Sequence, residues 1–152
     1  MVNLSNQRIV RQVEISVFKH ATEDRAKVLR AVRNLFPKDA EFPNYTETNL
    51  EGYFGDPIIT LHFQIKHRRS ATELFNNILE NLSSLDYVSL LDELPQRIDE
   101  TKNLYLRLDK QKAYLGKIAL ERHDPIRVKV SLLVPHKVDP AEHLREYLEA
   151  KS

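Results

Sequence analysis

The sequence contains no cysteine, which excludes disulfide bonds, thiolate metal ligands and a cysteine nucleophile. It has only three glycines, and none lies in a phosphate-binding loop of the P-loop or dinucleotide type. No window holds about 18 consecutive apolar residues, so we expect no membrane-spanning helix. Residues 1–12 lack the apolar segment of an export signal. We therefore expect a cytoplasmic protein.

Positive and negative charges almost cancel, with 23 Lys+Arg against 22 Asp+Glu and a net charge of +1. A protein that binds nucleic acid without sequence preference is usually far more basic. Only a local cluster of cations could therefore indicate a nucleic-acid partner. The 152 residues, 41% of them hydrophobic, suffice for one core. We expect a single domain over residues 1–152, with two halves (about 9–98 and 103–150) that share this core.

Hydrophobic periodicity predicts an α+β fold, a mostly antiparallel sheet with helices packed on one face. Its element order is βαββαα-β(α)ββα. Alternating apolar and polar residues predict strands at residues 9–20, 44–51, 58–66, 103–109, 117–121 and 126–134. Helical spacing predicts helices at about 22–36, 70–82, 84–97 and 140–149, with a short helix at about 110–115.

Several local signals fix the expected ends and faces of the helices. Thr22 is the expected N-cap of the first helix, and Ser70 to Glu73 form the capping box of the second. Asp109 is the expected cap of the short helix, and Gly116 ends its last turn. The expected inward-facing residues of the third and the short helix are Leu85, Val88, Leu91, Leu94, Tyr114 and Leu115.

The stretch 103–118 carries the strongest functional signal, because it interleaves cations with aromatic rings. Such a pattern suits a phosphate backbone and an unpaired base. The alternative interpretation is a basic turn whose tyrosines pack in the ordinary way. The candidate RNA-binding residues of this stretch are Tyr105, Arg107, Lys110, Lys112, Tyr114 and Lys117.

Two further clusters of cations are candidates for the same surface. Lys66, Arg68 and Arg69 lie between a predicted strand and a predicted helix, where a helix N-terminus would help them bind phosphate. Arg127 and Lys129 share one face of the strand 126–134, and they extend the patch if that strand pairs near 103–109. The alternatives are a solvated strand end for the first cluster and cross-strand ion pairs for the second.

Signals for catalysis and metal binding are weak in this sequence. The six histidines are scattered, and the nearby pair His62 and His67 gives no ligand geometry. No spacing gathers carboxylates as a metal-dependent nuclease would require. We expect no metal site, no cofactor and no enzymatic activity.

Three motifs together resemble a known family: residues 103–118, the run Val17 to Asp24, and the run Gly55 to Ile58. They are similar to archaeal proteins described as predicted exosome-associated RNA-binding proteins. The similarity extends from about Val13 to the C-terminal helix. It implies an α+β fold like that of the ribosomal protein that binds the small RNA of the large subunit.

Residues and resemblance together predict a noncatalytic RNA-binding protein, an accessory factor in RNA processing or degradation. RNA is the expected partner, and the resemblance adds the exosome. The alternative is a protein-interaction adaptor without RNA contact, docking through the acidic stretch from Asp86 to Glu100. A homodimer formed by pairing of edge strands is also compatible with the pattern.

Overall fold

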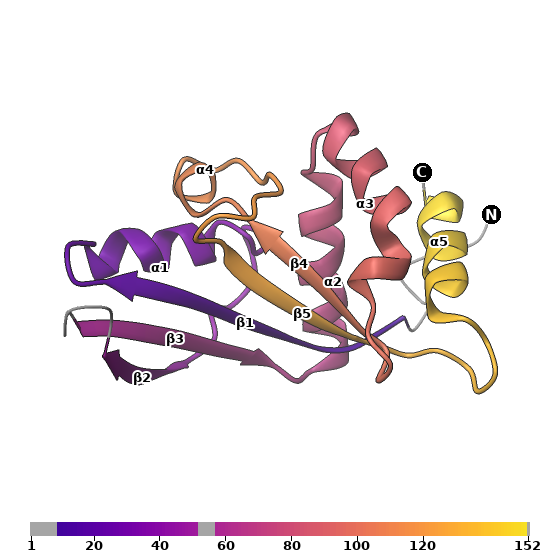
Figure 1. Ribbon diagram of the computed structural model, residues 1–152, viewed down its shortest axis with the longest axis horizontal. Helices are drawn as coiled ribbons and strands as arrows, with labels where there is room; N and C mark the ends of the chain where they lie inside the picture. Colours follow the sequence, from indigo (N-terminus) through magenta and orange to yellow (C-terminus); the bar gives the residue numbers. More distant parts are fainter. Residues whose placement is uncertain (1–8, 52–56, 152) are drawn as a thin grey trace.

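The computed structural model describes residues 9–51 and 57–151, and in it five strands form one sheet (Figure 1). Its strand order is β2-β3-β1-β5-β4, and every neighbouring pair is antiparallel. The strands are β1 (Val10–His20), β2 (Tyr45–Glu51), β3 (Pro57–Ile65), β4 (Asn103–Leu108) and β5 (Ile126–Leu132). The predicted α+β class is confirmed.

Helices occupy one side of this sheet. They are α1 (Arg25–Arg33), α2 (Arg68–Glu80), α3 (Ser84–Arg97), α4 (Lys110–Tyr114) and α5 (Pro140–Lys151). Hydrogen bonds tie them into one layer, joining α2 to the end of α1, α4 to α1, α5 to α2, and α5 to α3. None of the helices in the described ranges combines the length and the apolar character that crossing a membrane would require.

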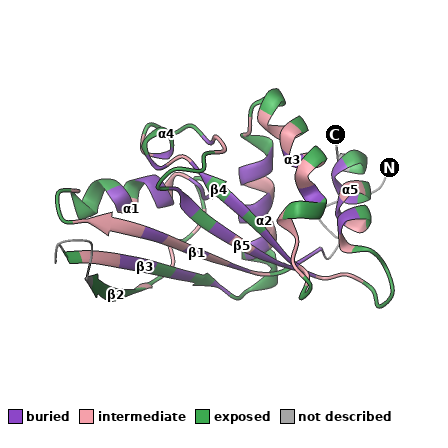
Figure 2. Cartoon of the chain, viewed as in Figure 1, coloured by how far each residue is buried: buried purple, intermediate pink, exposed green. Residues whose placement is uncertain are grey.

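Strand alternation gives the sheet two different faces. Val13, Ile15 and Val17 of β1 are buried beneath the helices, whereas Glu14, Ser16 and Phe18 point to the opposite side. Leu104, Leu106 and Leu108 of β4 and Val128 and Val130 of β5 add to the same core. Figure 2 shows this alternation as buried and exposed bands along β5. We call the helix-free side the open face.

Two predicted helix starts are wrong. Asp24, not Thr22, is the N-cap of α1, and its side chain accepts a hydrogen bond from the Ala26 N–H at 3.0 Å. The capping box at Ser70 is absent because α2 begins at Arg68, only two residues after β3, with His67 as its N-cap. The cap of the short helix is confirmed, since the Asp109 side chain accepts from the Lys112 N–H.

The buried side of α3 also differs from the prediction. Leu85 is 76% exposed and Val88 is 53% exposed, contrary to the prediction. Leu94 is fully buried as predicted, and Leu90 is buried in addition. The difference arises because α5 packs along the Tyr87 side of α3, where the Tyr87 hydroxyl donates to the Leu148 carbonyl oxygen. Helical spacing predicted an apolar stripe, but not which side of the helix α5 would cover.

Smaller corrections concern the neighbourhood of α4. Leu115 is 72% exposed and does not fold back onto the core, whereas Tyr114 packs partly against it. The expected strand at 117–121 is reduced to a single bridge between Leu108 and Leu120. Gly116 has φ +86°, the left-handed conformation expected of the residue that ends this turn. Gly55 and Asp56 of the resemblance motif lie outside the described residues, while Pro57 and Ile58 begin β3.

Candidate nucleic-acid interface

The pairing of β4 with β5 places two clusters of candidate residues side by side. Tyr105 lies opposite Lys129, and Arg107 lies opposite Arg127. Paired residues in an antiparallel ladder project to the same side, so all four belong to the open face. The condition under which Arg127 and Lys129 extend the patch, pairing of their strand with residues 103–109, is therefore met.

The open face forms a shallow hollow with a volume of about 750 Å³. Lys66 lies at one end of it, beyond the last residue of β3. No helix contributes to the lining, which comes from all five strands and the segments next to them. The polar side chains of this lining that project to the open face include Glu14, Ser16, Thr46, His62, Gln64, Lys66, Tyr105, Arg127 and Lys129.

Most cations of the open face are not neutralised by a close carboxylate. The Arg127 guanidinium lies over the Phe18 ring at 5.0 Å. Lys129 has one acidic neighbour, with 3.9 Å between its Nζ and the Glu14 Oε2. Among the described residues, no salt bridge involves Lys66, Arg107 or Arg127. The surface is thus locally positive although the whole chain is nearly neutral.

Tyr105 supplies an exposed ring that is held at its hydroxyl end. The residue is 41% exposed, and its hydroxyl donates to the Asp99 Oδ2 at 2.8 Å. This hydrogen bond raises the pKa of Tyr105. Burial raises the pKa of Asp99, but hydrogen bonds from Asn103, Tyr105 and Thr101 outweigh it and hold that pKa well below its ordinary value. Asp99 therefore stays ionised and fixes the position of the ring.

The structure contradicts one candidate RNA contact, Lys110. This residue is only 8% exposed, and its Nζ donates to the Phe18 carbonyl oxygen at 2.8 Å and to Glu23 and Asp124 at 3.0–3.2 Å. Burying an ammonium group is costly unless it is paired, and here two carboxylates pair it. Lys110 is a structural cation and has no free donor direction toward a phosphate.

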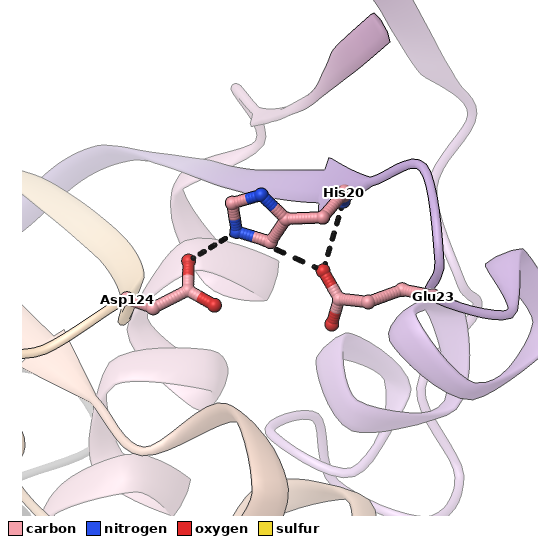
Figure 3. A group of neighbouring side chains, drawn as sticks. All are labelled: His20, Glu23 and Asp124. Carbon is pink, nitrogen blue, oxygen red and sulfur yellow. Dashed lines mark hydrogen bonds and ion pairs between the residues drawn. The ribbon is translucent and has the colours of Figure 1, made fainter. Parts of the chain in front are cut away.

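The carboxylates around Lys110 also form the one group among the described residues with the composition of a metal site. His20, Glu23 and Asp124 place their ligand atoms within 4.8 Å of one another (Figure 3). Burial raises the pKa of Asp124, but hydrogen bonds from Lys110 and His20 bring it below the ordinary value. The Lys110 ammonium already pairs with both carboxylates of this group.

The remaining candidates lie away from the open face. Tyr114 belongs to α4 on the helical side, where its ring centre lies 5.4 Å from the Arg30 guanidinium and 5.9 Å from the Lys27 Nζ. Lys112 and Lys117 flank it and are exposed. Arg68 and Arg69 lie in the first turn of α2, and Arg69 pairs with Glu73 at 3.2 Å. The candidate residues therefore do not converge on a single surface.

Some residues of these surfaces were not predicted from the sequence. Phe18 is an apolar residue at an outward position of the first strand, and its alternation with Val17 was the available signal. Lys27 and Arg30 are spaced three apart on α1, so a helical projection would have paired them. Nothing local in the sequence points to Glu23 as the partner of Lys110, since the two lie 87 residues apart.

Comparison with known proteins agrees with a nucleic-acid role for this architecture. A family model described as RNA binding matches residues 12–132. The chain belongs to this RNA-binding family. The RNA-binding protein PAB1135 of Pyrococcus abyssi is 39% identical over 147 residues, which are 91% of this chain and 94% of that protein.

Solved structures of other archaeal proteins share the fold of this RNA-binding family member. AF2318 of Archaeoglobus fulgidus is 35% identical, with a TM-score of 0.79 over 91% of this chain and 99% of that one. Mth689 of Methanothermobacter thermautotrophicus is 33% identical, with a TM-score of 0.76 over 92% and 98%. The resemblance to an archaeal RNA-binding family is confirmed, while the exosome link and the likeness to a ribosomal protein stay predictions.

Proposed function

We propose that the chain binds RNA across the open face of its sheet. The observation that carries this proposal is the register of β4 and β5, which places Tyr105 and Arg107 directly opposite Lys129 and Arg127. These cations suit the phosphate backbone, and Lys66 extends their reach along the hollow. Sheets that bind single-stranded RNA combine such cations with exposed rings on which bases stack.

The test is a titration of fluorescent single-stranded RNA followed by anisotropy at fixed, low salt. Replacing Arg127 and Lys129 together by glutamine should weaken binding about a hundredfold or more, since each charge-assisted contact contributes roughly 1.5–3 kcal/mol and every 1.4 kcal/mol is tenfold. The matched control replaces Lys38 and Lys137, which are exposed and lie outside the hollow. Equal affinity of the two double variants would contradict the proposal.

The role of Tyr105 is tested separately by two substitutions. Tyr105→Phe keeps the ring and removes only the hydrogen bond to Asp99. Tyr105→Leu removes the ring, and a lost base stack costs about 1–3 kcal/mol. We expect the leucine variant to bind RNA clearly more weakly than the phenylalanine variant. Equal binding by both would show that Tyr105 is not a stacking platform.

We further propose a noncatalytic accessory role in RNA processing, in the cytoplasm and next to the exosome. The support is the RNA-binding family, the chemistry of the open face and the resemblance seen in the sequence. The expected result is that tagged protein co-purifies exosome subunits and leaves labelled RNA uncut in the presence of divalent metal ions. Cleavage that disappears in a carboxylate variant of the His20–Glu23–Asp124 cluster would overturn the noncatalytic part.

One observation favours the adaptor as a second candidate function. Leu85 and Val88 are exposed on α3, where the acidic residues Asp92 and Glu93 lie one turn further along. This surface fits a partner protein that presents apolar side chains within a basic rim. A protein partner should co-purify with the wild type even after nuclease treatment. Leu85→Ser with Val88→Ser should abolish this co-purification and leave the binding of RNA unchanged.

A further inference from the structure

A second cationic surface lies on the helical side of the molecule. It consists of Lys27 and Arg30 from α1 and Lys112, Tyr114 and Lys117 from α4 and the turn after it, and we call it the α1–α4 surface. The two cations of α1 lie beside the Tyr114 ring. Asn34 at the end of α1 holds α4 in place, because its side-chain amide donates to the carbonyl oxygens of Ala113 and Tyr114.

Its four cations remain available to a ligand. All are exposed, and the salt bridges between described residues include none of them. Glu121 lies near Lys112, and its pKa is lowered by the Arg122 and His123 N–H groups and, to a smaller degree, by Lys112. The Lys117 N–H donates to the Lys112 carbonyl oxygen at 2.8 Å, so the backbones of these two lysines lie next to each other.

The sheet separates this surface from the open face. The α1 residues Val28, Ala31 and Val32 pack into the core, so α1 and α4 lie on the covered side, opposite Arg127 and Lys129. Figure 1 shows α1 and α4 together on one side of the strands. An RNA strand that followed one surface would have to turn around the sheet to reach the other.

An ion-paired cluster lies between the end of β1 and the start of β5. Lys110 of α4 is buried against Glu23 and Asp124, and Asp124 also contacts His20. Figure 3 shows His20, Glu23 and Asp124 side by side. Because the Lys110 ammonium is already paired with these two carboxylates, this cluster offers no free cation to a phosphate backbone. The sheet therefore keeps the α1–α4 surface and the open face apart.

We infer that the α1–α4 surface binds a second segment of RNA, so that one molecule bridges two RNA segments. This inference rests on the proposed RNA binding by the open face. Cations gathered around a partly exposed ring are suited to a flexible single strand, because cations meet its phosphates and the ring can accept a base. The protein would hold two RNA segments together without making or breaking a covalent bond.

The experiment is a capture assay with two unrelated single-stranded RNAs. One RNA carries biotin and is bound to beads, and the other carries a fluorophore. Wild-type protein should retain the fluorescent RNA on the beads. Replacing Lys27 and Arg30 by glutamate should abolish this capture and preserve binding of a single RNA in solution. Lys112→Glu with Lys117→Glu is a second such variant, in which both replaced residues are exposed.

Matched controls separate the possible causes. Lys38→Glu with Lys137→Glu makes the same change in net charge away from both surfaces and should capture RNA like the wild type. Arg127→Glu with Lys129→Glu should also lose capture, since one of the two surfaces is gone. Capture that persists in both α1–α4 variants would overturn the inference, for example if a dimer bridged the RNAs through two open faces.

The two proposals fail in different ways. Wild-type protein that binds no RNA in solution contradicts the function of the open face. Wild-type protein that binds single RNAs but never captures a second one contradicts only the role of the α1–α4 surface.

Discussion

At the scale of single residues, Lys110 shows how burial changes the meaning of a charge. In the sequence, Lys110 is one of three lysines that follow the predicted strand 103–109. In the fold, its ammonium group contacts the end of β1, the segment before α1 and the turn before β5. A lysine that links three segments contributes to folding, and its charge is not available to a ligand. Lys112, two residues further on, is exposed.

Replacing Lys110 by methionine should therefore destabilise the protein. Breaking a buried ion pair costs about 3–5 kcal/mol, and we expect roughly 2–4 kcal/mol because the carboxylates keep some contact with water. Glu23 is 28% exposed and Asp124 is 38% exposed. Lys112→Met is the matched control and should change stability by less than about 0.5 kcal/mol. Urea denaturation measures both, and equal stability would show that the ion pairs contribute nothing.

The lowered pKa of Asp99 predicts how the stability of the protein depends on pH. Hydrogen bonds keep its pKa in the folded state below the ordinary value of 3.8. A depressed pKa of a carboxyl group contributes stability that is present above the unfolded pKa and is lost as the pH falls through the folded one. Wild-type protein should lose this contribution as the pH falls below 3.8, while Asp99→Asn should lose less over the same range.

The measurement is thermal unfolding of both proteins at neutral pH and at successively lower pH. The difference in Tm between wild type and variant should shrink as the solution becomes more acidic. Because the pKa of Asp124 is also lowered, both proteins should lose some stability in acid. A constant difference at every pH would show that Asp99 does not titrate between the folded and unfolded states.

At the scale of elements, two substitutions at the start of α1 test whether the N-cap is Asp24, as in the structure, or Thr22, as the sequence predicted. Asp24→Ala removes the acceptor of the Ala26 N–H and should cost about 1 kcal/mol. Thr22→Ala should cost less than about 0.5 kcal/mol, because the residue is exposed and lies outside the helix. Chemical denaturation of the two variants decides between the caps, and a larger loss for Thr22→Ala would contradict the structure.

The elements themselves could largely be predicted from the sequence, because strands and helices follow local periodicity. The alternation of Leu104, Leu106 and Leu108 with Tyr105 and Arg107 is observed directly in β4. The side of α3 that is buried could not be predicted, because it depends on α5, and Tyr87 and Leu148, which are in contact, lie 61 residues apart along the chain. Helical periodicity predicts a stripe of apolar residues, and contacts with other elements determine which residues of the helix are buried.

The candidate site was predictable only where neighbouring strands determine it. The antiparallel register of β4 and β5 brings Arg127 and Lys129 next to Tyr105 and Arg107. From the sequence, this arrangement followed only on the condition that the two strands pair. Lys110 and Tyr114 lie within ten residues of Tyr105, yet the turn into α4 carries them to a different part of the fold. Closeness in sequence was a poor guide to which cations share a surface, because a strand and the following helix pack on different sides.

At the scale of the whole molecule, a net charge of +1 conceals an uneven distribution. Lys66, Arg107, Arg127 and Lys129 lie on the open face. Among the described residues, Glu14 is the only carboxylate that forms an ion pair with any of them. Carboxylates gather instead near Lys110 and along α3. Long-range attraction of RNA should thus be weak, while contact on the open face is favourable.

This distribution makes the salt dependence of RNA binding a quantitative test of where the RNA lies. Each phosphate neutralised on a single strand contributes about −0.7 to the slope of log Kobs against log salt concentration, so four cations predict a slope of about −3. Arg127→Gln with Lys129→Gln should make that slope shallower by about 1.4, because two phosphate contacts are lost. Lys38→Gln with Lys137→Gln has the same charge and should keep the wild-type slope. If both double variants gave the same slope, the phosphates would not lie on β5, and the positive character of the open face would have no part in RNA recognition.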